Sequence, residues 1–140
     1  MKGLFISLLL SVSSAAFSEV KADALMGVWL TEIKDAKITI YKKANKYYGR
    51  VSWMKETNDE NGNPLIDKNN PNENLRNRKI FGMDILIGFV YDNDGEWDGK
   101  IYDPKNGTTY TCKLWLDKNN LKVRGYLGWL FDTKVWTKAV

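Results

Sequence analysis

The side chains that could take part in chemistry are carboxylates, amines, guanidiniums and hydroxyls. The 140-residue sequence contains no histidine and one cysteine, Cys112. Without histidine a Ser-His-Asp or Cys-His centre cannot be built, and zinc, copper and haem sites would lack their usual ligands. A lone cysteine cannot form an intrachain disulfide. We therefore expect no metal, no cofactor and no disulfide.

Two arginines, Arg76 and Arg78, lie close together in the stretch NPNENLRNRKIFG, residues 70–82. A pair of guanidinium groups could hold a carboxylate or phosphate through paired hydrogen bonds. The same groups could instead bind backbone carbonyls, or the carboxylates of Glu73 and Asp84. The arginines are candidate ligand contacts under the first interpretation and structural under the second.

Tyr102 and Asp103 occur in GKIYDPKNGTTY, residues 99–110. One interpretation is a substrate loop, with Asp103 as general base and Tyr102 as hydrogen-bond donor. The other is a hairpin turn in which Asp103 accepts backbone N–H groups and Gly107 adopts a left-handed conformation. A carboxylate that caps its own turn would contradict the catalytic interpretation.

Two acidic stretches, DENGNPLIDKNN (59–70) and DNDGEWD (92–98), raise the question of calcium binding. An EF-hand loop requires Gly at its sixth position and Glu at its twelfth. Counted from Asp59, these positions hold Pro64 and Asn70. The spacing of the carboxylates is also not diagnostic of glycoside hydrolysis.

Short strand-like runs separated by turn signals extend over the chain from residue 27 onwards. They cover residues 27–33, 37–42, 46–53, 84–92, 96–103, 108–116, 121–128 and 133–138. This pattern predicts an all-β, eight-stranded antiparallel up-and-down barrel. A barrel of this size has room for one small ligand. A long insert, residues 54–81, separates the third and fourth strands, and we expect it to fold over the barrel.

The N-terminus has the layout of a cleaved secretory signal, with Lys2, an apolar run from Leu4 to Leu10, and small residues up to Ser18. Residues 1–18 are therefore the predicted signal peptide and 19–140 a single domain, exported to the periplasm or secreted. The apolar run is too short to span a bilayer. The formal net charge of +4 is small and its charges are interspersed, which does not favour nucleic-acid binding.

Several of these motifs occur together and in order: GVWLT, GRVSW, DENGNPLIDKNNPNENLRNR, GKIYDPKNGTTY, LKVRGYLG and VWTK. As a set, they resemble domain-of-unknown-function family 2147, small exported bacterial proteins with a lipocalin-like barrel. The resemblance covers the chain from Gly27 to Lys138. It implies the barrel and the export signal, and no established activity.

The resemblance also implies a structural pair. Lipocalin-like barrels commonly cover a tryptophan of the first strand with an arginine from a late strand. The matching residues are Trp29 and Arg124, which would close one end of the barrel. The alternative role for this pair is ligand contact.

Three functions follow from these residues. The preferred one is binding of a small apolar or amphipathic ligand, or of a cell-envelope component. The candidate contact residues are Arg76, Arg78, Trp53, Tyr47, Tyr102 and Asp103. Of these, Trp53 and Tyr47 are expected to face the cavity. The second is a filled barrel that docks an envelope protein through an exposed aromatic surface around Trp115. The third is a carboxylate-based enzyme centred on Asp103. Catalysis is the least favoured, and the oligomeric state stays open.

Overall fold

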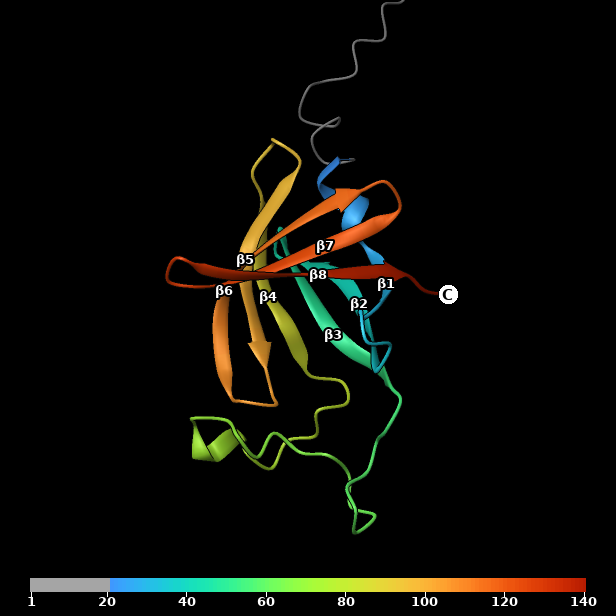
Figure 1. Ribbon diagram of the computed structural model, residues 1–140, viewed down its shortest axis with the longest axis vertical. Helices are drawn as coiled ribbons and strands as arrows, with labels where there is room; N and C mark the ends of the chain where they lie inside the picture. Colours follow the sequence, from blue (N-terminus) through green and yellow to red (C-terminus); the bar gives the residue numbers. More distant parts are fainter. Residues whose placement is uncertain (1–20) are drawn as a thin grey trace, which may run out of the picture.

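The computed structural model describes residues 21–140, which form a closed barrel of eight antiparallel strands (Figure 1). Each strand pairs with the next, and β8 pairs with β1. The strands are β1 (Gly27–Leu30), β2 (Ala36–Lys43), β3 (Lys46–Met54), β4 (Asp84–Tyr91), β5 (Glu96–Asp103), β6 (Thr108–Asp117), β7 (Asn120–Leu127) and β8 (Leu130–Lys138). The predicted all-β up-and-down barrel is confirmed. The predicted signal peptide lies outside the described residues.

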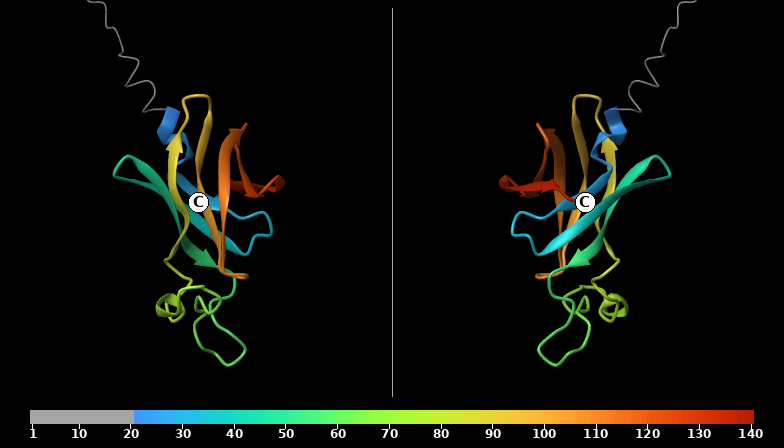
Figure 2. Two further views of the ribbon diagram at one scale, coloured as in Figure 1. Left: turned by 90° about the vertical axis from the view of Figure 1, so that its left-hand side faces the viewer. Right: turned by 90° about the vertical axis from the view of Figure 1, so that its right-hand side faces the viewer.

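Two 3-10 helices lie at opposite ends of the barrel. The helix η1 (Asp23–Leu25) precedes β1, and η2 (Glu73–Leu75) lies in the connection between β3 and β4. That connection, residues 55–83, is hereafter the insert. The ribbon views place η1 at one end of the barrel and the insert beyond the other (Figures 1 and 2). We refer to them as the η1 end and the insert end.

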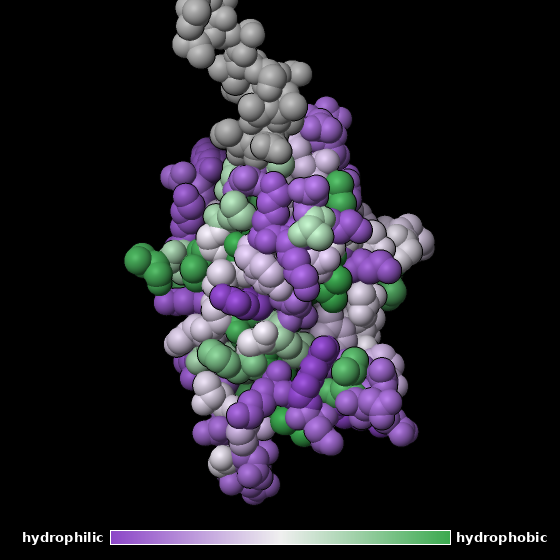
Figure 3. Space-filling view, turned by 180° about the vertical axis from the view of Figure 1, so that it is seen from behind, coloured by the Kyte–Doolittle hydropathy of each residue, from purple (hydrophilic) through white to green (hydrophobic). Residues whose placement is uncertain are grey.

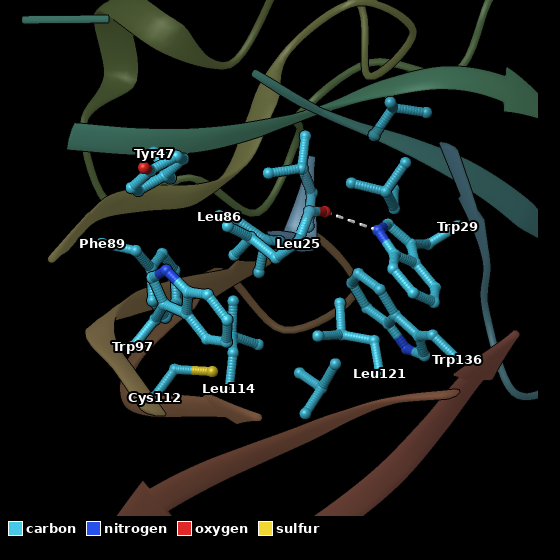
Figure 4. Packing of buried hydrophobic residues seen from close by; sticks show 14 residues of the cluster. Leu25, Trp29, Tyr47, Leu86, Phe89, Trp97, Cys112, Leu114, Leu121 and Trp136 are labelled. Atoms are coloured by element: carbon cyan, nitrogen blue, oxygen red, sulfur yellow. Dashed lines mark hydrogen bonds between the residues drawn. The ribbon is translucent and has the colours of Figure 1, made fainter. Parts of the chain in front are cut away.

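The η1 end is filled by large side chains (Figure 4). Fully buried residues there include Leu25, Trp29, Trp97, Phe89 and Leu114. The indole N–H of Trp29 donates to the carbonyl of Leu25 at 2.8 Å, and that of Trp97 donates to the carbonyl of Ala22 at 2.9 Å. Because each indole finds a backbone acceptor, these rings are buried without an unpaired donor.

Tyr47 is also part of this packing. Its ring is buried, and its hydroxyl donates a hydrogen bond to Asp23 of η1. This bond, together with Lys42, lowers the pKa of Asp23. The expectation that Tyr47 faces a ligand cavity is therefore wrong: the side chain fastens η1 to the filled end.

Trp53 does not face the interior either. The pairing of β2 with β3 shifts between Lys37 and Ile38, so that Ser52 is an extra residue on β3. Such a bulge turns the following side chain to the other face. Trp53 is 40% exposed, and the Lys37 ammonium lies 5.4 Å from the centre of its ring. The predicted cavity-facing position of Trp53 is wrong because simple alternation along β3 stops at Ser52.

The predicted pair of Trp29 and Arg124 is also wrong. On β7, Leu121 and Val123 are buried, so the alternation of the strand directs Arg124 outwards. Its guanidinium lies 4.9 Å from the ring centre of Trp115 and 4.3 Å from that of Phe131. Trp29 is covered by η1 instead.

The outer surface is mainly polar. Viewed from behind, hydrophilic side chains dominate the face and apolar ones form small separate areas (Figure 3). Trp115 is only partly exposed beneath Arg124, so the predicted aromatic surface is not centred on it. Among residues 21–140, no helix has the length and apolar character that crossing a bilayer would require.

Candidate functional site

The insert end of the barrel is hollow. One cavity of about 460 Å³, the seam cavity, is lined from β4 to β8 by residues that include Ile85, Ile101, Tyr102, Tyr110, Val123, Gly125, Leu127, Leu130, Phe131 and Lys134. A second cavity of about 570 Å³, the insert cavity, lies between the barrel mouth and the insert, with lining residues that include Ile38, Val51, Met54, Leu65, Ile66 and Ile80. The two cavities share Ile85, Asp103 and Pro104, so they adjoin.

The seam cavity lies where the barrel is least completely closed. The short strand β1 pairs with β8 only at Trp29–Lys138 and Leu30–Thr137 within the described chain. The earlier part of β8 is therefore paired with β7 alone. The Glu32 carboxylate, from the β1–β2 turn, accepts a hydrogen bond from the Val135 backbone N–H at 3.0 Å. The Glu32 side chain thus takes the place of a pairing strand along part of β8.

The rim of the seam cavity carries a small charged cluster. The Lys134 ammonium lies 3.1 Å from the Asp132 carboxylate and 3.8 Å from that of Glu32. Its hydrogen bond with Asp132 is the main cause that raises the pKa of Lys134. The cavity therefore has an apolar lining and a polar rim, which is the usual composition of small-molecule sites.

The insert is fixed to the barrel by a buried polar network around Asp67. The Asp67 side chain has no exposed surface. Its carboxylate accepts a hydrogen bond from the Tyr102 hydroxyl at 2.5 Å, from the Asn70 amide at 2.8 Å, and from Arg78 Nε at 3.1 Å. Since a buried carboxylate is costly unless paired and hydrogen-bonded, these contacts account for its position. We call these four residues the latch.

Tyr102 is the barrel's contribution to the latch. Burial, and next the hydrogen bond to Asp67, raise the pKa of Tyr102 to about 12. Arg78 lies over the same ring at 5.9 Å from its centre. Tyr102 therefore stays protonated as a donor at neutral pH, in a structural contact.

A second contact joins the insert to the β5–β6 turn. The Asn69 amide donates to the carbonyls of Pro104 and Lys105 at 3.1 and 3.0 Å. A Cβ added to Gly107 would lie 1.9 Å from the Asn69 carbonyl oxygen, and Gly107 has a φ of +70°. The backbones approach so closely that only glycine fits there.

The remaining predicted residues have structural contacts. Arg76 donates from Nε to the Asn70 carbonyl at 2.7 Å and lies 3.9 Å from Glu73, both within the insert. Asp103 accepts the backbone N–H of Lys105 at 2.9 Å. Asp103 therefore caps its own turn, which removes the geometric support for a general base, although it borders both cavities.

The structure brings Arg78 and Tyr102 together around Asp67 and leaves Trp53 and Tyr47 apart from them. Arg76 joins the same group only through the Asn70 carbonyl. Sequence reasoning missed Asp67, which joins Arg78 and Tyr102. The sequence does contain a signal, because Asp67 directly follows the apolar residues Leu65 and Ile66. If these apolar residues pack against the barrel, Asp67 is buried with them and its carboxylate needs a hydrogen-bond partner. The role of the predicted residues in ligand binding stays a prediction.

A closed, eight-stranded antiparallel barrel, filled at one end and hollow at the other, is a lipocalin-like fold. Residues 27–138 match the family model described as "Uncharacterized protein conserved in bacteria (DUF2147)", and the chain belongs to this family. Among the residues described, no group of three Asp, Glu, Cys or His side chains is arranged to hold a metal ion.

The chain is also similar to a solved structure described as "Protein HP1028 from the human pathogen Helicobacter pylori belongs to the lipocalin family". The TM-score is 0.70 and the sequence identity 24%, over 83% of each chain. At this identity the similarity shows the fold alone. No curated protein matches the sequence.

Proposed function

We propose that this protein is an exported barrel that binds a small apolar or amphipathic molecule in its hollow end. The observation that carries the proposal is the pair of adjoining cavities of about 460 and 570 Å³ at the insert end. Ligand pockets typically have volumes of roughly 300–1,000 Å³ and a mainly apolar lining. The filled η1 end leaves the insert end as the place for a ligand.

An amphipathic ligand fits better than a purely polar one. Ile85, Ile101 and Val123 present apolar surface inside the seam cavity, and Lys134 and Asp132 lie at its rim. An apolar chain would bury its surface against the first group, while a polar end would remain near the charged pair and water. Export to the periplasm or the medium is part of the proposal and rests on the layout of residues 1–18.

Native mass spectrometry tests the proposal on protein exported to its own compartment and on the same protein after denaturation and refolding. We expect a bound mass on the exported sample that is absent after refolding. A clean apo spectrum from the exported protein would contradict the proposal.

Two substitutions of isoleucine by tryptophan locate the ligand. Ile101→Trp places the larger ring in the seam cavity, whereas Ile87→Trp adds the same ring on β4, where Ile87 is an exposed residue outside both cavities. We expect the first variant to lose the bound mass and the second to retain it. Circular dichroism and urea unfolding of both variants check that each is folded. A bound mass retained by a folded Ile101→Trp variant would place the ligand elsewhere.

A further inference from the structure

The tip of the β7–β8 hairpin is the most exposed run of apolar side chains in the described chain. Over residues 127–131, here called the tip, Leu127 is 63% exposed, Trp129 87%, Leu130 53% and Phe131 60%. The fifth residue is Gly128, so the tip carries no charge. Large exposed apolar surfaces that persist in a folded protein mark sites of interaction.

The fold does not require these residue types. Leu127 pairs with Leu130, so the turn has two central residues, Gly128 and Trp129. Gly128 has a φ of +61°, as the first central position of a type II′ turn requires. Trp129 is at the second central position, where the turn does not require a large ring. Polar residues are usual in such turns. Trp129 is therefore not explained by the turn.

The tip is held firmly in its exposed position. Behind it, Tyr126 pairs with Phe131, and their ring centres are 6.0 Å apart. The Arg124 guanidinium also lies against the Phe131 ring, 4.3 Å from its centre. In the ribbon view the hairpin extends sideways beyond the wall of the barrel (Figure 1). The apolar tip is thus a fixed projection.

The tip is continuous with the interior of the barrel. Leu127, Leu130 and Phe131 are both exposed and part of the lining of the seam cavity. Ile101 and Val123 extend the same lining inwards. An apolar chain that enters beside the tip would remain in contact with apolar side chains from the surface to the interior.

The other route into the hollow end is obstructed. The insert lies over the mouth, fastened by the buried carboxylate of Asp67 and by the Asn69 contacts with the β5–β6 turn. The seam beside β8 is covered only in part, by the Glu32 side chain, because β1 pairs with only two residues of β8. The entrance is therefore on the side that carries the tip.

From this arrangement we propose that the tip inserts into a lipid surface and that single-chain amphipathic lipids pass between that surface and the seam cavity. The inference rests on the proposed ligand-binding function and names the source of the ligand. A narrow projection with a tryptophan at its apex suits a lipid interface, where the ring is buried and the indole N–H remains near water. A protein partner would need a matching pocket, whereas a bilayer needs none.

Vesicle flotation tests the first half of the proposal. The experiment uses a chain of residues 19–140, which contains η1 and the whole barrel. This chain lacks the apolar run Leu4–Leu10, which could itself bind lipid. The vesicles contain phosphatidylcholine and phosphatidylglycerol. The doubly substituted Leu127→Ser, Trp129→Ser variant is compared with Trp53→Ser, which removes an exposed tryptophan elsewhere on the barrel.

We expect the double substitution to weaken vesicle binding by about tenfold or more, because two large apolar side chains no longer enter the lipid. Trp53→Ser should bind as the unsubstituted chain does. The proposal is overturned if the unsubstituted chain does not float with the vesicles, or if the tip variant floats equally well. It is also overturned if the tip instead holds two copies of the chain together, seen as a dimer that the tip variant loses without any vesicle binding.

Transfer of a fluorescent lysophospholipid tests the second half. The probe is offered either as monomers in water or within donor vesicles. The tip variant in this assay is the single substitution Trp129→Ser, because Trp129 does not line the seam cavity whereas Leu127 does. We expect it to bind the monomeric probe with unchanged affinity and to load from vesicles about tenfold more slowly. Equal loading rates for the tip variant and the unsubstituted chain would overturn the proposed route. Failure of every protein to bind the monomeric probe would contradict ligand binding itself, while the flotation result would still decide lipid contact by the tip.

Discussion

The two ends of this barrel are built by different means. At the η1 end, Trp29, Trp97 and Leu25 are fully buried, and the indole groups are satisfied by backbone carbonyls. At the insert end, Ile85 and Ile101 are only partly buried and border cavities. Apolar packing stabilises the first end, and a polar latch around Asp67 holds the insert at the second.

This difference separates stability from binding. An interior packed to ordinary protein density has no room for a ligand, so the filled end supplies the free energy of folding and the hollow end is available for function. A lid held by packing alone would fill the space that it covers. The hydrogen bonds from Tyr102 to Asp67 and from Asn69 to the β5–β6 turn fix the insert in place and leave about 570 Å³ beneath it.

The largest contrast should come from truncating one side chain at each end. Trp29→Ala should lower the free energy of unfolding by about 3–5 kcal/mol, because it leaves a large void in the packed half. Ile101→Ala should cost less than about 2 kcal/mol, since that side chain already borders a cavity. Urea unfolding measures both values. Equal losses would mean that the two ends are packed alike in solution.

The latch should give the next largest effect. Asp67→Asn keeps the size of the side chain and removes the charge that faces Arg78 and Tyr102, which should cost about 1.5–3 kcal/mol. Hydrogen exchange should quicken mainly in residues 55–83, because the insert loses its attachment while the η1 end is untouched.

Glu73→Gln is the matched control for the latch. Glu73 is exposed and lies 3.9 Å from Arg76, also within the insert, so its loss should cost less than about 1 kcal/mol. Faster exchange spread evenly over the barrel in Asp67→Asn would show that the latch supports the whole fold rather than the insert.

Alanine substitutions at two glycines compare the free space in the packed half of the barrel with that in the hollow half. A Cβ at Gly49 would lie 2.7 Å from Leu86 Cδ1 and 2.9 Å from Ile38 Cγ2, so Gly49→Ala should cost about 1–2 kcal/mol. A Cβ at Gly125, in the seam cavity, would approach no atom closer than 3.7 Å. Gly125→Ala should therefore be neutral or stabilise by up to about 1 kcal/mol. Thermal unfolding measures the stability of both variants. A lower unfolding temperature for Gly125→Ala than for Gly49→Ala would contradict the comparison.

The barrel itself was predictable because strand alternation and turn residues are local features. On β7, the alternation of apolar and polar residues places Leu121 and Val123 on the inner face, and both are buried. The same alternation directs Arg124 outwards, so the pairing with Trp29, which came from the family resemblance, conflicted with the residue pattern. Alternation failed at Trp53, where the bulge at Ser52 depends on pairing with β2 and leaves no mark in β3 alone.

The hollow end was less predictable because its contacts join distant parts of the chain. Asp67 and Tyr102 are 35 residues apart, and no periodic pattern links them. The β7–β8 hairpin was also predicted too short, with strands ending at 128 and resuming at 133. The turn consists of Gly128 and Trp129 only. The apolar residues after it were therefore interpreted as a loop, whereas in the structure they form the start of β8.

The last predicted effect concerns Tyr102 and is confined to alkaline pH. The pKa of Tyr102 is raised to about 12, above the ordinary value of 10.0, so between these values the folded protein holds a proton that the unfolded chain has lost. Stability from this group is therefore complete below pH 10 and is lost as the pH rises towards 12. Tyr102→Phe should reduce that loss by about 2 kcal/mol, measured as urea unfolding from pH 9 to about 12.

Tyr41 provides the comparison for this effect. Its pKa is also raised to about 12, by burial and by its hydrogen bonds to Asp84 on the barrel wall. Tyr41→Phe should reduce the alkaline loss of stability similarly. Of the two tyrosines, however, only Tyr102 contacts Asp67, so only Tyr102→Phe should also quicken hydrogen exchange in the insert. If both variants left the insert equally protected, Asn69 and its contacts with the β5–β6 turn would be the attachment that holds the insert over the hollow end.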